Sequence, residues 1–195
     1  MAAPANKNIG DLNGKWVMNK TLSSNVEPGL ALQGIGWVLR KAVSLATLTL
    51  NIKQYTAPPS PPADPTGPQV THIEIEQTGT GGIKGTYEKR CLDYTFRDHS
   101  DYLFGNVKGQ SKWLNLEDIE DPFLRSGWLE GDNEKGGPNG ETHIISHVES
   151  LDAPWTATQI WGFKEIDGVR RHVRNVVIAK GSERVELQLV YDWLE

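Results

Sequence analysis

The sequence of 195 residues has a single cysteine, Cys91, and therefore cannot form an internal disulfide. It contains no lysine/arginine block longer than the pair Arg170-Arg171, and its formal net charge is −5. Binding to a phosphate backbone depends on clustered positive charge, so we expect no nucleic-acid partner. The longest uncharged stretch among the apolar segments, residues 42–52, is too short to cross the hydrocarbon core of a bilayer, about 30 Å thick. We therefore expect no membrane span.

The N-terminal residues lack two further features. Residues 1–10 show no periodic pattern of apolar residues, and they contain no apolar core of a secretory signal. We therefore expect a flexible tail over residues 1–10 and a single domain over residues 11–195. The missing signal and the single cysteine together favour a reducing, cytoplasmic location.

Motifs of common catalytic sites are also missing. The chain contains neither the Gly-x-Ser-x-Gly elbow of hydrolases nor the Gly-x-x-x-x-Gly-Lys-Ser/Thr loop of nucleotide-binding proteins. His143 and His147 would lie roughly 13 Å apart on the strand that we predict for them, too far to share a metal ion. Cys91 has no histidine nearby in the sequence to activate its thiol. We therefore expect no metal and no cofactor.

Short segments of alternating apolar and polar residues, which are typical of half-buried strands, run through the chain. They are residues 14–18, 47–55, 70–77, 83–96, 102–116, 127–129, 142–151, 156–166, 168–179 and 184–193. One segment has helical features: residues 28–46, broken at Gly34-Ile35-Gly36 into two short helices. The pattern predicts an all-β fold, an antiparallel sandwich or closed barrel.

Six prolines lie between Ala57 and Pro68. Proline cannot donate ladder hydrogen bonds and prefers extended geometry, so we expect an exposed loop between two strands. The alternative is a docking site for a proline-reading domain, which would make the chain a protein-interaction module.

Tryptophan is frequent, with seven residues that outnumber both tyrosine and phenylalanine. In a domain of this size some must lie in the core, and we assign Trp16 and Trp193 to it. The alternation around Trp161 puts one neutral polar group among apolar side chains on one face: Ala157, Gln159, Trp161 and Phe163. Such a face is typical of a ligand cavity. The alternative is that Trp161 fills a solid core.

The first fifty residues combine a Gly-x-Trp strand at residues 14–16, the run Leu-Gln-Gly-Ile-Gly-Trp-Val-Leu-Arg-Lys-Ala at residues 32–42, and a hydrophobic strand from Thr47. This combination resembles the opening of the intracellular fatty-acid-binding proteins of the calycin superfamily. The resemblance implies a ten-stranded, up-and-down antiparallel barrel around an internal cavity. A short helix-turn-helix lid would follow the first strand.

The carriers of that family bind a carboxylate through an inward arginine two residues before a tyrosine on the last strand. This chain is similar at Tyr191 but has Leu189 in the place of the arginine. The resemblance therefore implies that a fatty-acid carboxylate loses its partner. An apolar or neutral ligand is then favoured, because an unpaired carboxylate is costly to bury.

The whole chain is also similar to fungal proteins of the fatty-acid-binding type that are encoded beside secondary-metabolite pathways. Some of those are cofactor-free cyclases, including hetero-Diels–Alder enzymes. A pericyclic step needs only apolar partners in a near-attack pose and a hydrogen bond to a developing oxygen charge. We therefore expect a cofactor-free cyclase of the hetero-Diels–Alder type that binds a hydrophobic small molecule. The alternative is a non-enzymatic intracellular carrier of a lipid or apolar metabolite.

Candidate site residues follow from parity and from the resemblance together. Tyr191 and Gln159 are the expected catalytic residues, because both can donate a hydrogen bond to a carbonyl oxygen. The expected ligand-binding residues are the apolar side chains of the same inward faces and one residue of the lid: Trp161, Phe163, Leu187, Leu189 and Trp37. We expect Trp37 to control entry.

Overall fold

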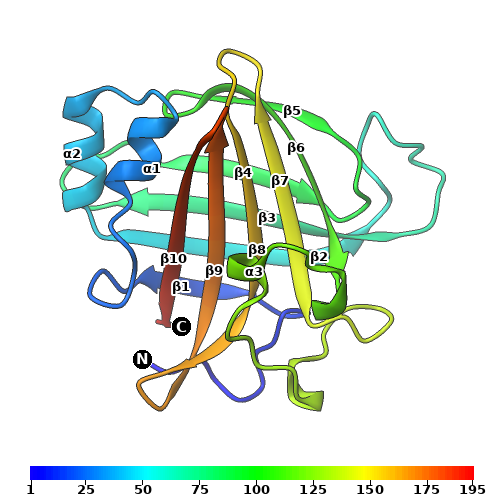
Figure 1. The fold of residues 1–195 in the computed structure, drawn as a ribbon. Coiled ribbons are helices and arrows are strands. Elements are labelled where there is room, and N and C mark those ends of the chain that lie inside the picture. The colour runs from blue at the N-terminus through cyan, green and yellow to red at the C-terminus, as the bar shows by residue number, and fades with distance from the viewer.

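Ten strands form one sheet in the computed structural model, which describes residues 1–195 (Figure 1). In chain order they are β1 (Gly14–Met18), β2 (Leu48–Ala57), β3 (Val70–Gly79), β4 (Thr86–Cys91), β5 (Arg97–Asp101), β6 (Gly105–Leu114), β7 (His143–Ser150), β8 (Thr156–Ile166), β9 (Val169–Lys180) and β10 (Glu183–Trp193). Their order is β4-β3-β2-β1-β10-β9-β8-β7-β6-β5, and every neighbouring pair is antiparallel. The predicted all-β antiparallel barrel is confirmed.

The sheet curls so that its two halves face each other. Figure 1 shows β2 to β4 crossing behind β7 to β10 at a steep angle. β4 and β5 are the two ends of the strand order, and no ladder joins them. The barrel is therefore nearly closed, with a gap in its wall between β4 and β5.

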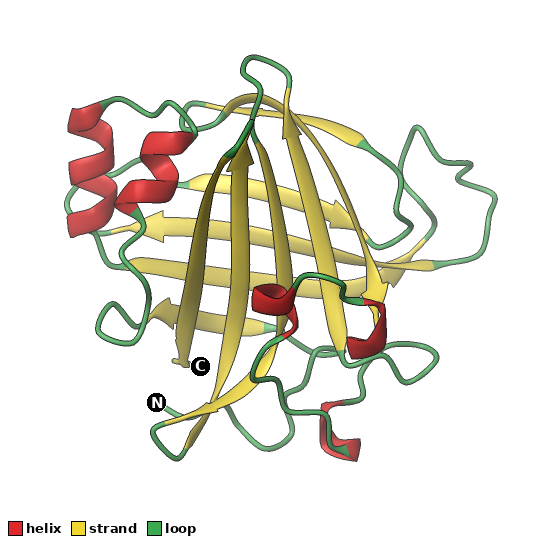
Figure 2. Ribbon diagram, in the orientation of Figure 1, coloured by secondary structure: helices red, strands yellow, loops and turns green.

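Two helices follow β1, as the sequence predicts: α1 (Glu27–Leu32) and α2 (Trp37–Leu45) (Figure 2). Gly34 joins them with φ +83°, a conformation that glycine adopts without strain. Gly29 of α1 lies so close to the barrel that a Cβ there would be 2.6 Å from Ile178 and 2.9 Å from Leu187. This helical lid is therefore closed tightly over its end of the barrel. No helix of the chain combines the length and the apolar character needed to cross a bilayer.

Some predicted element positions are wrong. Residues 127–129 form no strand, and β5 is a separate strand that the sequence did not predict, because its five residues are all polar or charged. One-turn helices also lie outside residues 28–46: α3 (Pro122–Arg125) and two 3₁₀ turns, Leu116–Asp118 and Asp132–Glu134. Residues 115–140 hold these turns and cover the outer face of β8 and β9, where Leu124 packs on Ile160 and Val177.

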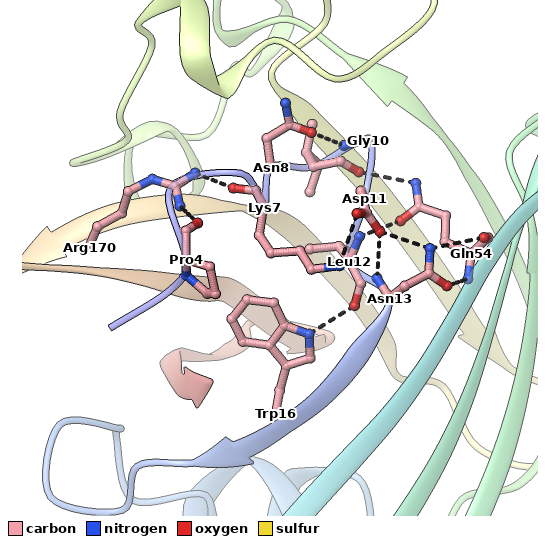
Figure 3. Close-up of polar contacts among 11 residues, drawn as sticks. Pro4, Lys7, Asn8, Gly10, Asp11, Leu12, Asn13, Trp16, Gln54 and Arg170 are labelled. Atoms are coloured by element: carbon pink, nitrogen blue, oxygen red, sulfur yellow. Dashed lines mark hydrogen bonds and ion pairs between the residues drawn. The ribbon is translucent and has the colours of Figure 1, made fainter. Parts of the chain in front are cut away.

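The N-terminal residues pack against the barrel, which corrects the flexible tail expected over residues 1–10. Ile9 is fully buried in the main apolar cluster. The Arg170 guanidinium donates hydrogen bonds to the carbonyl oxygens of Pro4 (3.2 Å) and Lys7 (2.7 Å) (Figure 3). These contacts are long-range and irregular, so no periodic pattern in the sequence signals them.

Figure 3 also shows how this segment is tied to the first two strands. The Trp16 indole donates to the carbonyl oxygen of Leu12 (2.9 Å). The Gln54 backbone N–H donates to the Asn13 side-chain oxygen (2.7 Å), and the Asn13 amide donates back to the Gln54 carbonyl oxygen (3.2 Å). The N-terminal segment is thereby fixed at the end of the barrel where β1 begins.

Apolar side chains fill this end of the barrel. Trp16 is fully buried, as predicted, and meets Phe163 edge to face at 6.2 Å and Trp193 at 4.8 Å between ring centroids. Inward residues of β2 and β3 join the same cluster: Leu50, Ile52, Ile73 and Ile75. One end of the barrel is therefore solid, and open space lies elsewhere.

Candidate active site

A cavity of about 830 Å³ passes through the gap between β4 and β5. Its outer part lies beneath the proline-rich loop and is lined by Pro61, Pro62 and Tyr55. Its inner part is lined by inward side chains of β4 and β6, among them Arg90 and Ser111. The opening therefore lies in the barrel wall, away from the helical lid.

The proline-rich loop is exposed over most of its length, as expected, but Arg97 fastens it to the barrel. The Arg97 guanidinium donates to the carbonyl oxygens of Ser60 (2.6 Å) and Pro61 (3.1 Å). The same guanidinium pairs with Asp93 at 2.6 Å. Although burial opposes it, this pairing lowers the pKa of Asp93 to about 2, so the pair is ionised at neutral pH. The loop is thus held over the outer mouth of the cavity.

Charged side chains occupy the inner end of the cavity. Arg90 and Glu88 of β4 pair with Ile73 and Ile75 of β3 in register, and those isoleucines point into the core. The Arg90 guanidinium lies 2.5 Å from the Glu88 carboxylate and donates to the Ser146 hydroxyl at 2.5 Å. Burial alone would raise the pKa of Glu88, but nearby arginine charges hold it below its ordinary value. Glu88 is therefore an ionised partner for Arg90.

A second arginine lies behind the first. Arg174 of β9 is opposite Trp161 of β8 and Leu189 of β10 in register. Its guanidinium lies 3.9 Å from the centroid of the Trp161 ring, and the Arg90 guanidinium lies 5.2 Å from the same ring. Two cations therefore border one indole. Arg174 is buried, and its Nε and Nη2 have no hydrogen-bond partner.

Arg174 bears on one expectation about the interior. We expected a carboxylate to lose its partner because Leu189 replaces an arginine. The structure supplies a cation at the same level from the neighbouring strand, since Arg174 is paired with Leu189. Position 189 alone therefore does not describe the charge of the interior, because strand β9 also faces it.

Tyr191 of β10 and Gln159 of β8 lie on the inward faces of their strands, as the alternation in the sequence predicts. The Arg174 guanidinium is 5.3 Å from the centroid of the Tyr191 ring. Burial raises the pKa of Tyr191, so its hydroxyl stays protonated at neutral pH and can donate. The Gln159 side-chain oxygen accepts a hydrogen bond from the Trp161 indole at 3.0 Å. That bond fixes the ring and leaves the Gln159 amide N–H groups as donors.

The other predicted ligand-binding residues fall into three places. Trp161 is fully buried between the arginines and the core, and Phe163 packs deeper in the solid end. Leu187 and Leu189 belong to a second apolar cluster with Val176 and Ile178, near α1. Trp37 is 63% exposed at the start of α2. None of the seven predicted site residues lines the cavity itself, but the cavity-lining Arg90 lies 5.2 Å from the Trp161 ring. The structure therefore brings Gln159, Trp161 and Tyr191 together and leaves Trp37 apart.

The cysteine has a histidine neighbour that the sequence did not reveal. Cys91 Sγ lies 3.9 Å from His72 Nε2 and 3.3 Å from the Asp93 carboxylate. His72 Nε2 also lies 2.9 Å from the Pro58 carbonyl oxygen, which it can reach only as a donor. Burial raises the pKa of the Cys91 thiol. This arrangement keeps Cys91 as a thiol and does not make it a nucleophile.

Sequence reasoning missed Glu88, Arg90 and Arg174. One signal was available for Arg174, because it shares the parity of Val176 and Ile178, two apolar residues on the inner face of β9. A charge at an inward position of an apolar strand indicates a functional group, since burying it is costly. For Glu88 and Arg90 the strand is short and mostly polar, and its inner face is not evident.

Comparison with known proteins gives two full-length relatives, although no family model matches the sequence. The probable pericyclase scpY of Mollisia scopiformis is 30% identical over 198 aligned positions, which cover 99% of this chain and 95% of that protein. The pericyclase pydY of an Acremonium species is 33% identical over 196 positions, which cover 100% of this chain and 97% of that protein.

Solved structures agree on the fold. Lipid binding protein 8 of Caenorhabditis elegans has a TM-score of 0.57 and 15% identity, with 95% of this chain and 99% of that chain covered. The Schistosoma mansoni fatty acid binding protein, solved with arachidonic acid, has a TM-score of 0.56 and 14% identity, with coverage of 97% and 100%. At these identities the likeness establishes a barrel of the fatty-acid-binding type.

Proposed function

Because the chain belongs to the same family as these two fungal pericyclases, we propose that it catalyses a pericyclic cyclisation of the hetero-Diels–Alder type on an apolar substrate inside the barrel. The observation that carries the proposal is a buried cluster beside the inner lining of the cavity. There the Trp161 ring, which lies 5.2 Å from the guanidinium of the cavity-lining Arg90, adjoins the hydrogen-bond donors of the buried residues Arg174 and Tyr191.

The first contribution of the protein is to hold the reacting groups together. The cavity of about 830 Å³ falls within the range of small-molecule sites, about 300–1,000 Å³. A diene and its partner folded into this space react as one molecule, which replaces an encounter in solution. The planar face of Trp161 suits a conjugated substrate, and the Gln159 hydrogen bond keeps the ring from turning.

The second contribution is electrostatic. In a cycloaddition with a conjugated carbonyl, the carbonyl oxygen gains negative charge in the transition state. A donor already aimed at that oxygen stabilises the charge and pays no reorganisation cost, and one such donor is worth about 10²–10³ in rate. Tyr191, Arg174 and the Gln159 amide are the groups placed to donate.

The reaction itself demands no covalent partner from the protein. In a [4+2] step, three π bonds become two σ bonds and one π bond, and no proton or leaving group departs. A nucleophile–base pair is therefore unnecessary, and the protonated thiol of Cys91 stays outside the chemistry.

The test uses linear substrates that carry a conjugated diene and an α,β-unsaturated carbonyl. Each substrate is incubated with the purified protein and with buffer alone, and the cyclised isomers of unchanged mass are separated by chiral chromatography. We expect faster cyclisation and enrichment of one stereoisomer. Saturable binding with no acceleration and an unchanged isomer ratio would instead identify a carrier.

A further inference from the structure

One arginine inside the barrel has no carboxylate partner. Arg90 is paired with Glu88, but no carboxylate lies within salt-bridge distance of Arg174. The basic side chains of β5 that share the inward parity are paired: Arg97 with Asp93 at 2.6 Å, and His99 with Asp101 at 3.1 Å. The positive charge of Arg174 is therefore not compensated by an ion pair.

Two nitrogens of the Arg174 guanidinium have no hydrogen-bond partner. The side chain is buried, with the residue 6% exposed, and Nε and Nη2 donate to no group in the protein. These two nitrogens share one edge of the guanidinium plane, the edge that can grip two oxygens at once. Burying these two donors without a hydrogen-bond acceptor costs free energy. We therefore expect a bound ligand to provide the acceptor that the protein lacks.

Arg90 extends the same positive region to the cavity. Arg90 lines the cavity, and its Nε also has no hydrogen-bond partner. The guanidinium groups of Arg90 and Arg174 lie 5.2 Å and 3.9 Å from the centroid of the same Trp161 ring. A ligand that reaches the inner end therefore meets the guanidinium of Arg90 first and that of Arg174 behind it. Val107 and Val148 line the cavity and belong to the apolar cluster that also contains Leu187, so they offer the apolar part of such a ligand a contact surface.

We propose that the substrate carries an acidic oxygen head group, a carboxylate or the enolate of a 1,3-dicarbonyl, which binds at the free edge of Arg174 beside Arg90. This inference rests on the proposed function and names the substrate class for the same site. Both head groups present two oxygens that share one negative charge, which matches the two donors of one guanidinium edge. The negative charge of the head group also gives Arg174 the ionic partner that the protein does not provide.

The experiment measures binding without turnover, with two matched pairs of probes. The first pair is cis-parinarate, a fluorescent polyene carboxylate, and its methyl ester. The second is 5-phenylcyclohexane-1,3-dione, which ionises to an enolate, and its neutral methyl enol ether. We expect the anion of at least one pair to bind about tenfold or more tightly than its neutral partner. The pair that shows the preference identifies the head group.

Two variants locate the preference. Arg174→Gln should reduce the anion's advantage to about twofold or less, because the anion loses far more affinity than the neutral probe. Arg184→Gln, which removes the same charge from an exposed arginine paired with Asp121 and Glu186, should leave the advantage intact. Arg174→Lys keeps the charge but loses the two-donor edge, and we expect it to retain part of the preference.

Several results would overturn the proposal. Equal affinity of wild-type protein for anion and neutral partner in both pairs contradicts it without any variant, so it stays testable even if Arg174→Gln fails to fold. If Arg174→Gln and Arg184→Gln reduced the anion's affinity advantage equally, the preference would come from the overall charge of the protein and not from Arg174. Cyclisation of neutral substrates with no preference for anions would refute this inference alone, whereas an anion preference with no cyclisation would refute the proposed function alone.

Discussion

Replacing Tyr191 by phenylalanine removes one hydroxyl from the buried cluster of Trp161, Arg174 and Tyr191 and leaves the ring in place. The ring is buried and stacks on His172 with centroids 5.5 Å apart, so its packing does not depend on the hydroxyl. Because burial raises the pKa of Tyr191, the group that is lost is a protonated donor at neutral pH. The variant should therefore fold normally and lose a hydrogen bond to the substrate oxygen.

The expected loss in kcat for Tyr191→Phe is roughly ten- to a hundredfold, about 1.4–2.7 kcal/mol, because one donor to a developing oxyanion is removed while Arg174 and the Gln159 amide remain. The assay is single-turnover cyclisation, with thermal unfolding measured on the same preparation. Tyr102→Phe is the matched control, since that hydroxyl is exposed and donates to the Lys84 carbonyl oxygen away from the cavity. Equal rates for Tyr191→Phe and wild type, with unchanged unfolding, would refute the assignment.

Three predictions concern the fold and its response to pH. Deleting residues 56–69 and joining the ends with a short turn should leave cooperative unfolding intact, because loop closure changes by only about 0.6 kcal/mol per doubling of length; a non-cooperative melt would show that the loop is part of the core. Arg170→Gln should lower the free energy of unfolding by about 3 kcal/mol in urea titrations, because it leaves the buried Glu134 carboxylate, now 2.6 Å from Arg170, unpaired; a change below about 1 kcal/mol would contradict this. Burial lowers the pKa of His172 well below its ordinary value, so the unfolded chain binds this proton more readily, and the free energy of unfolding should fall as pH drops below about 6.5. His172→Phe should flatten that slope between pH 7 and 5, and an unchanged slope would exclude His172 as its source.

The sequence predicted the parts of the site that depend on alternation. Gln159 and Trp161 share a face in the sequence pattern, and the structure joins them by a hydrogen bond. Most strands and the position of the two lid helices follow from the same kind of pattern, whereas the ten-stranded barrel was implied by the resemblance to fatty-acid-binding proteins. Local periodicity was sufficient there because each strand has one face in the interior and one outside.

Arg174 was missed for a physical reason. Residues 172–178 of β9 are all buried, because residues 115–140 cover the outer face of β8 and β9 and remove the usual contrast between inner and outer positions. Alternation of apolar and polar residues then disappears, so only the parity shared with Val176 and Ile178 could have assigned Arg174 to the inner face. The packing of residues 1–10 and the fastening of the proline-rich loop by Arg97 depend on contacts between distant segments, which no local pattern records.

The central claim is that cyclisation takes place in the cavity between β4 and β5, and filling that cavity tests it most directly. Gly109 lines the cavity, and a Cβ there would lie 3.5 Å from the Val148 side chain and 3.6 Å from the His147 carbonyl oxygen, which is ordinary contact. Gly109→Leu should therefore fold and occupy the space of the substrate. Gly131→Leu, at a glycine with no neighbour within 4 Å, is the control for the same substitution. We predict that Gly109→Leu lowers the cyclisation rate about tenfold or more with little change in thermal unfolding, whereas Gly131→Leu keeps the wild-type rate. A wild-type rate in a folded Gly109→Leu variant would contradict the account.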